Sequence, residues 1–96
     1  MLAKEGRTFI QAIFAEDAAA KQQGLKGEAL GQWRKERIAP LYEEFARWRD
    51  AVLPTLLPDE PLAGVLRYYT THWIALTRWV GDPKLPPDNS ASERVF

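Results

Sequence analysis

The sequence predicts an all-α protein, a small antiparallel helical bundle of three to four helices. Apolar residues recur three and four positions apart along much of the chain, which is the spacing of one face of a helix. Proline and glycine fall between these stretches, and no segment alternates apolar and polar residues as a half-buried strand does. Antiparallel helices packed along their apolar seams are the fold that this pattern favours.

The first helix is expected over residues 3–22. Its apolar stripe consists of Phe9, Ile10, Ile13 and Phe14. Gly24 and Gly27 then end the helix, and a second helical stretch begins near Glu28. Pro40 lacks a backbone N–H and clashes with the preceding turn, so it either starts a new helix or kinks a long one.

Two later segments carry the most regular apolar seams. The first seam consists of Ile38, Leu41, Phe45, Trp48 and Val52. Its heptad-like spacing predicts a partner helix, and Pro54 and Pro58 close the segment. Asp59 is the expected N-cap of the next helix, with Pro61 near its start. The seam of that helix consists of Leu62, Leu66, Tyr69, Trp73, Leu76 and Val80. Gly81 then ends it.

The length and composition are those of one globular domain. The chain has 96 residues, 46% hydrophobic and 27% charged. It contains no cysteine, which excludes disulfides and thiolate metal sites. No apolar run approaches the roughly 20 residues that span a bilayer, and the N-terminus lacks a signal-peptide pattern. We therefore expect a cytoplasmic protein with no membrane partner.

The charged residues predict no general attraction to nucleic acid, because 13 basic and 13 acidic residues cancel. A local basic patch would have to come from Arg34, Arg37, Arg47 and Arg49. Glu36, Glu43 and Glu44 lie among them, and such mixed charges on a helix usually form a solvated face. We favour that solvated face over a DNA-binding patch.

Two further features of the last predicted helix are candidate sites. Arg67, Thr71 and Arg78 share the face opposite its seam, where the arginines could contact phosphate. His72 is the only histidine, and without Cys or His companions it is better interpreted as a flanking residue than as a metal ligand.

The last twelve residues, LPPDNSASERVF, predict a stiff loop followed by the start of a helix. Ser90 and Glu93 have the spacing of a capping box, and Asp88 could cap one register earlier. Only two residues follow Arg94, which is less than one helical turn. A cap worth about 1 kcal/mol is an adequate explanation of Glu93. From residue types alone, the chain is a small helical domain.

The stretch PLAGVLRYYTTHWIALTRWVGDPKLPPDNSASER, residues 61–94, resembles the C-terminal part of bacterial transposases of the insertion sequence 66 family. The positions that match the family pattern are Pro61, Leu62, Tyr69, Trp73, Ala75, Leu76, Arg78, Leu85, Pro86, Asp88, Asn89, Glu93 and Arg94. The D-N-x-x-x-E-R ending is the most specific part, although Ser90 and Ser92 replace the family's second asparagine and its alanine. Residues 30–48 also look like the family's arginine-rich helix.

The resemblance implies a place in a DDE transposase, in which two aspartates and a glutamate on a ribonuclease-H-like core hold two Mg²⁺ or Mn²⁺ ions for DNA cleavage and strand transfer. It makes Glu93 the third acid and a metal ligand of the intact protein. The residues implied to cap and position its helix are Asp88, Asn89 and Ser90. The candidate contacts to DNA phosphate are Arg94, Arg78 and Arg67.

The two aspartates of that triad have no counterpart in the chain, and one carboxylate cannot hold two metals. We therefore expect a fragment of a larger ribonuclease-H-like transposase, inactive and without a cofactor when alone. Residues 1–80 would be a helical region of the central domain, and residues 81–96 the proline-rich loop and the start of the helix with the last acid. Whether the chain is itself an enzyme stays open.

Two other functions stay open as alternatives. The first is a stand-alone helical interaction module without catalysis, which associates with its own copy or with an intact transposase through the seam at residues 38–52. The second is a DNA-binding module that uses the four arginines between residues 34 and 49. Because the net charge is zero, we rank the DNA-binding module last.

Overall fold

The computed structural model of the chain describes residues 2–87, and every regular element in that range is helical. The helices are α1 (Leu2–Gln22), α2 (Gly27–Trp33), α3 (Ala39–Val52), α4 (Pro61–Thr71) and α5 (Trp73–Thr77). A π-helical segment (Arg34–Ile38) joins α2 to α3, and 3-10 turns follow α3 (Leu53–Thr55) and α5 (Arg78–Gly81). The all-α prediction is confirmed for these residues, whereas the predicted helix start after Asp88 lies outside them.

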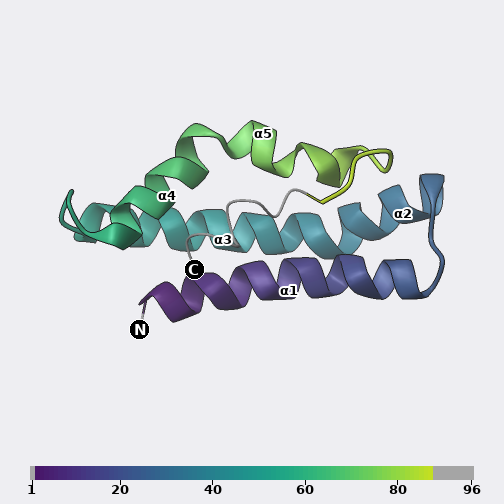
Figure 1. The fold of residues 1–96 in the computed structure, drawn as a ribbon, viewed down its shortest axis with the longest axis horizontal. Helices are drawn as coiled ribbons and strands as arrows, with labels where there is room; N and C mark the ends of the chain where they lie inside the picture. The colour runs from purple at the N-terminus through teal and green to yellow at the C-terminus, as the bar shows by residue number, and fades with distance from the viewer. Residues whose placement is uncertain (1, 88–96) are drawn as a thin grey trace.

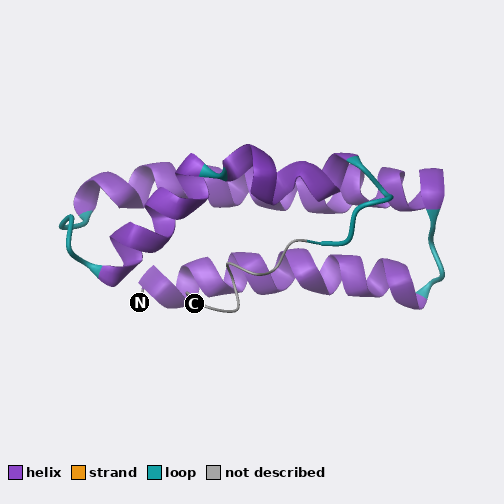
Figure 2. Cartoon of the chain, turned by 45° about the horizontal axis from the view of Figure 1, so that its top comes forward, coloured by secondary structure: helices purple, strands orange, loops and turns teal. Residues whose placement is uncertain are grey.

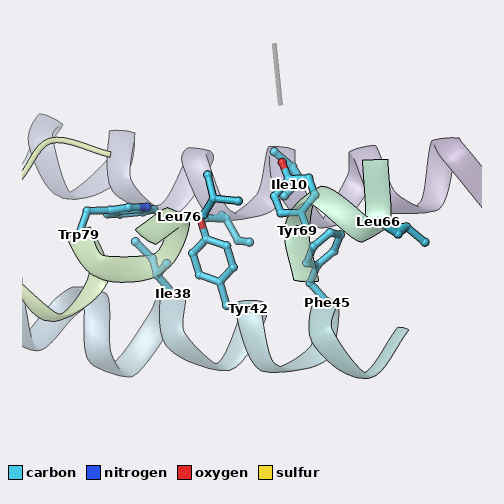
Figure 3. Close-up of a cluster of buried hydrophobic side chains, with 9 residues drawn as sticks. Ile10, Ile38, Tyr42, Phe45, Leu66, Tyr69, Leu76 and Trp79 are labelled. Atoms are coloured by element: carbon cyan, nitrogen blue, oxygen red, sulfur yellow. The ribbon is translucent and has the colours of Figure 1, made fainter. Parts of the chain in front are cut away.

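The helices form a long antiparallel pair with a third layer returning along it. α1 runs antiparallel to one continuous rod made of α2, the π-helical segment and α3, and α4 and α5 return along that rod (Figures 1 and 2). The core lies where the three layers meet, and Ile10, Phe45 and Leu66 come from one layer each (Figure 3). None of the helices in residues 2–87 has the length and apolar character needed to cross a membrane.

The turn between α1 and α2 forms where the two glycines predicted it. Gly24 and Gly27 have φ of 74° and 57°, in the left-handed region that residues with a Cβ rarely adopt. The backbone N–H of Gly24 donates to Lys21 O at 3.0 Å, and that of Leu25 donates to Ala20 O at 3.1 Å. These two bonds make a Schellman motif, which satisfies the last carbonyls of α1.

The π-helical segment keeps one stripe of side chains on the buried side of the rod. Leu30, Arg34, Ile38 and Tyr42 are all buried, although each follows the last by four residues. In an α-helix each such step rotates the stripe by about 40°, so three steps would turn it by about 120°. A π-helical turn contains more residues and rotates the stripe back. The segment also lies just before Pro40, which has no N–H for the carbonyl four residues earlier.

This geometry corrects the seam predicted for residues 38–52. Ile38 and Phe45 are buried as predicted, but Tyr42 and Arg49 are the other buried positions on that part of the rod. The predicted members Leu41, Trp48 and Val52 are only half-buried, at the edge of the core. The buried side of α3 is the side that meets the return layer, where Tyr42 and Arg49 both lie against Trp73, and the spacing of apolar residues alone does not indicate that side.

The last predicted helix is not continuous over residues 62–80. It breaks at His72, which has φ −106° and ψ 22°, and it ends as a 3-10 turn after Thr77. The hydroxyl of Thr70 donates to Leu66 O at 2.8 Å, and that of Thr77 donates to Trp73 O at 2.9 Å. Such bonds to the carbonyl four residues earlier commonly bend helices. Of the predicted seam, Leu66, Tyr69 and Leu76 are buried, whereas Leu62, Trp73 and Val80 are half-buried at the edge of the core. Trp79, which the seam did not include, is buried.

The start of α4 also differs from the prediction. Its N-cap is Glu60 rather than Asp59, with φ −67° and ψ 137° and no hydrogen bond from its side chain. Pro61 lies at the first helical position, where its missing N–H costs little because that group has no partner within the helix. The proline therefore determines where this helix begins.

Candidate functional site

The residues that the family pattern singles out at the C-terminus, Asp88, Asn89, Ser90, Glu93 and Arg94, lie outside the described residues. The structure shows the chain up to Pro87, immediately before them. The candidate site is therefore built from the segment that leads into this motif, Trp79–Pro87, and from the side chains that hold that segment.

Arg34, on the rod, holds the segment that leads into the motif. Its side chain is buried, with 1% exposed, and its Nη1 donates to three backbone carbonyl oxygens. The distances are 2.8 Å to Trp79 O, 3.1 Å to Asp82 O and 2.9 Å to Leu85 O. One guanidinium nitrogen thus joins three points along seven residues of chain, which lie 45 to 51 positions away in sequence.

The guanidinium of Arg34 is held in turn by a buried carboxylate from α1. Its Nε donates to Asp17 Oδ1 at 3.0 Å, and Asp17 is only 2% exposed. The ammonium of Lys21, one turn along α1, lies 3.6 Å from Asp17 Oδ2. A buried charge is costly unless it is paired and hydrogen-bonded, and the Asp17–Arg34 pair meets both conditions for the arginine.

An aromatic stack completes the surroundings of this ion pair. The guanidinium of Arg34 lies 4.9 Å from the centre of the Trp79 ring. That indole also stacks with Phe14, with ring centres 5.8 Å apart and planes 14° from parallel. The indole excludes water from the ion pair and adds an attraction between the ring and the cation. α1, the rod and the end of the return layer therefore meet at this cluster.

The interpretation of the rod arginines as a solvated face is wrong for two of them. Arg34 and Arg49 are buried, whereas Arg37 and Arg47 are exposed. Arg37 lies on the Trp33 ring, 4.3 Å from its centre. Because two of the four side chains are directed into the core, the four cannot form one DNA-binding patch.

A sequence signal for the buried pair existed, and charge counting concealed it. Arg34 lies four residues from both Leu30 and Ile38, and Asp17 lies four residues after Ile13 and three before Ala20. Each charge thus falls in register with an apolar stripe of its own helix. Two opposite charges in register on two neighbouring helices indicate a buried pair more strongly than a solvated face.

The candidate phosphate contacts in the return layer are on the surface. Arg67 and Arg78 are exposed, as is Thr71 on the same predicted face. Arg67 Nη2 donates to Pro58 O at 3.1 Å, which ties it to the start of α4. His72 is exposed beside the Tyr68 ring, at 4.7 Å between centres, which agrees with its interpretation as a flanking residue.

The described residues offer no metal centre of their own. Across residues 2–87, no three His, Asp or Glu side chains lie close enough together to hold a metal ion. Asp17, the buried carboxylate, is occupied by Arg34. Glu93, the acid implied as a metal ligand, is outside this range.

Comparison with known proteins identifies the family of the chain. The family model described as "Transposase IS66 family" matches residues 1–96, which is the whole sequence. The chain belongs to the IS66 family of transposases. Neither a curated protein nor a solved structure gave a match. Family membership places the chain in DNA transposition, and it implies DNA binding and the use of divalent metal ions by the intact IS66 transposase.

Proposed function

We propose that the chain is the helical segment that leads into the last catalytic acid of an IS66 transposase, and that it has no catalytic activity alone. Residues 1–80 form the helical region, and residues 81–96 form the loop and the start of the helix with that acid. The observation that supports this most is the segment Trp79–Leu85, which is tied to the buried Arg34 and leads directly into the D-N-x-x-x-E-R motif.

The proposed roles follow from the chemistry of strand cleavage and transfer. Two Mg²⁺ or Mn²⁺ ions, when bound in the intact family, activate the attacking oxygen and stabilise the leaving oxygen. Glu93 would supply one carboxylate, a suitable ligand for such hard cations. The residues proposed to position its helix are Asp88, Asn89 and Ser90. Arg94, Arg78 and Arg67 would contact DNA phosphate, as basic side chains do when they fix a duplex in register.

The number of acids supports the proposed inactivity of the chain alone. One glutamate cannot hold two metal ions, and among residues 2–87 no three His, Asp or Glu side chains lie close enough together to hold a metal ion. The test is a nicking and strand-transfer assay of the purified chain with supercoiled DNA and Mn²⁺. We expect no turnover above that of Glu93→Gln. Turnover that disappears in Glu93→Gln but persists in Glu28→Gln, an exposed control on α2, would overturn the proposed inactivity.

A second candidate function is supported by a groove between α1 and α3. The groove has a volume of about 480 Å³, and its lining residues are Glu5, Thr8, Phe9, Ala12, Leu41, Glu44 and Trp48. Leu41 and Trp48 belong to the seam from which self-association was expected, and they remain half-buried in the single chain. A second copy covering this groove would make the chain a helical interaction module.

Sedimentation equilibrium separates the two functions. A module that associates with its own copy would form a species of fixed stoichiometry, which Leu41→Glu dissociates into folded monomers. Arg47→Glu, an exposed change on the same helix, would leave that stoichiometry unchanged. A monomer at all concentrations would exclude self-association through this groove.

A further inference from the structure

The chain from Trp79 to Leu85 is held both by hydrogen bonds within the segment and by contacts from outside it. Within it, Asp82 N–H donates to Trp79 O at 3.3 Å, and Leu85 N–H donates to Asp82 O at 3.0 Å. Lys84 N–H donates to Asp82 Oδ1 at 3.0 Å. These bonds form two successive local turns, and they leave the direction of the segment relative to the helices open. The same Trp79, Asp82 and Leu85 carbonyls are the ones that accept from Arg34.

The segment is also seated against the start of the rod. The ring of Pro83 lies over Gly31 of α2, and a Cβ at Gly31 would be 3.6 Å from Pro83 Cγ, an ordinary packing distance. Arg34 is one turn further along the rod, so the proline ring and the guanidinium hold the same loop from adjacent turns. Arg34 uses two nitrogens at once, because Nε donates to Asp17 while Nη1 donates to the loop carbonyls. A lysine has a single nitrogen on a flexible stem, so it cannot make both sets of contacts in the same fixed geometry.

Two prolines carry this fixed direction toward the motif. Pro86 and Pro87 follow Leu85, the last residue that Arg34 contacts, and Asp88 follows them. A proline has its φ fixed near −65°, and consecutive prolines favour an extended, stiff conformation. The orientation of Leu85 therefore constrains where the chain enters the D-N-x-x-x-E-R motif. Catalytic groups need placement within about 0.5 Å, so a determined starting point has chemical value.

We propose that Arg34 is the positioning residue of the C-terminal acid motif, and that Asp17 orients Arg34 for this role. The inference rests on the proposed function, in which Glu93 is the third acid. Arg34 contacts neither substrate nor metal in this role. Its three bonds to carbonyl oxygens hold the segment Trp79–Leu85, which precedes the motif in the chain.

Distances between spin labels test this inference directly, because the chain has no cysteine and accepts labels at chosen sites. Three pairs are needed, each with one label at Lys4→Cys on the exposed side of α1. The partner at Lys84→Cys reports on the loop, and the partner at Ser92→Cys reports on the motif. The partner at Glu28→Cys is the control, because it reports on the packing of α1 and α2.

We expect one narrow distance peak for all three pairs in the otherwise unchanged chain. Arg34→Met should abolish the narrow peaks of the 84 and 92 pairs and leave the 28 pair unchanged. Arg34→Lys should have the same effect, because it keeps the charge but its single nitrogen cannot hold Asp17 and the three carbonyls together. If the fold needed only a positive charge at this position, Arg34→Lys would instead keep all three distance peaks narrow.

Three results would overturn the inference. The first is a 92 pair that is equally narrow in Arg34→Met, and the second is a 92 pair that is broad before any change at Arg34. The third is a narrow 84 pair and a narrow 92 pair in Arg34→Lys. This variant also tests the inference if Arg34→Met fails to fold. The labels report no catalysis, so this experiment and the nicking assay fail independently. Turnover sensitive to Glu93→Gln overturns the proposed inactivity and leaves the label distances unaffected.

Discussion

The two buried arginines of the rod, Arg34 and Arg49, are alike in their contacts and differ in how their charge is balanced. Each guanidinium lies on a tryptophan of the return layer, Arg34 at 4.9 Å from the Trp79 ring centre and Arg49 at 4.6 Å from that of Trp73. Each also donates to a backbone carbonyl of that layer, Arg34 to Trp79 O and Arg49 to Tyr69 O. The two arginines therefore join the rod to the return layer at two separate places.

The acids that face these arginines lie in different environments. Arg34 pairs with Asp17, which is 2% exposed and comes from a different helix. Arg49 pairs with its neighbour Asp50 at 2.9 Å, and the Asp50 side chain is 66% exposed. Water and salt screen the exposed pair far more than the buried one. The comparison teaches that burial of the carboxylate, rather than burial of the arginine, determines how strongly each junction depends on its ion pair.

Arg34→Met is expected to have the largest effect on this comparison. We expect the free energy of unfolding to fall by about 3–5 kcal/mol, because Asp17 stays buried without its charged partner. Urea denaturation followed by circular dichroism measures the loss. In Asp17→Leu/Arg34→Met both charges are gone, so we expect a smaller loss than in Arg34→Met alone. If the loss in the double variant equalled the sum of the losses in Asp17→Leu and Arg34→Met, the two charges would not be coupled.

Arg49→Met should cost less, about 2 kcal/mol in the same denaturation experiment. The change removes a charged hydrogen bond to Tyr69 O at 3.3 Å and the contact with the Trp73 ring, but it leaves no buried carboxylate behind. A loss as large as that of Arg34→Met would contradict the proposed difference between the two junctions.

Lys21→Met tests how much Lys21 contributes to balancing the charge of the buried Asp17. Lys21 is 61% exposed and lies 3.6 Å from Asp17 Oδ2, so most of its interaction is screened by solvent. We expect a loss of about 0.5–1 kcal/mol in the free energy of unfolding, which 1 M NaCl should reduce. Lys26→Met, an exposed change in the turn after α1, is the matched control. A loss comparable to that of Arg34→Met would mean that Lys21 is the main counter-charge of Asp17.

Asp50→Asn should have the smallest effect, below about 0.5 kcal/mol, because its carboxylate is largely in water. The amide can still accept from Arg49 Nε, so the geometry is retained. The measurement is the difference in urea midpoint between the variant and the unchanged chain, which should be smaller at high salt than at low salt. A loss in the free energy of unfolding above that of Lys21→Met would show that the exposed Asp50 matters to Arg49 as much as a buried carboxylate would.

Much of the secondary structure could be predicted from the sequence because its determinants are local. The helix expected over residues 3–22 is α1, and Gly24 ends it through a left-handed conformation that few other residues adopt. Pro61 starts α4 for an equally local reason. The break at His72 was not predicted, because the apolar period continues across it. Threonine bonds to preceding carbonyls compete with a regular helix without altering that period.

The candidate site divides in the same way. The D-N-x-x-x-E-R motif, with Glu93, was found by its pattern, and its placement stays a prediction because it lies outside the described residues. Arg34, which holds the segment before it, was assigned to a solvated face because acidic residues surround it in sequence. Its true partner, Asp17, is on another helix, and local charge patterns carry no information about that pairing.

By itself the sequence determined the all-helical class, the ends of the first helix, the place of Pro61 near the start of α4 and the resemblance to a transposase family, since period, glycine, proline and motif act over a few residues. Only the tertiary structure decided which charges turn inward. Arg34 meets Asp17 across 17 residues and the three carbonyls across 45 to 51 residues. The physical reason is that a charge can be buried only where several partners converge on it, and convergence of distant segments is a property of packing.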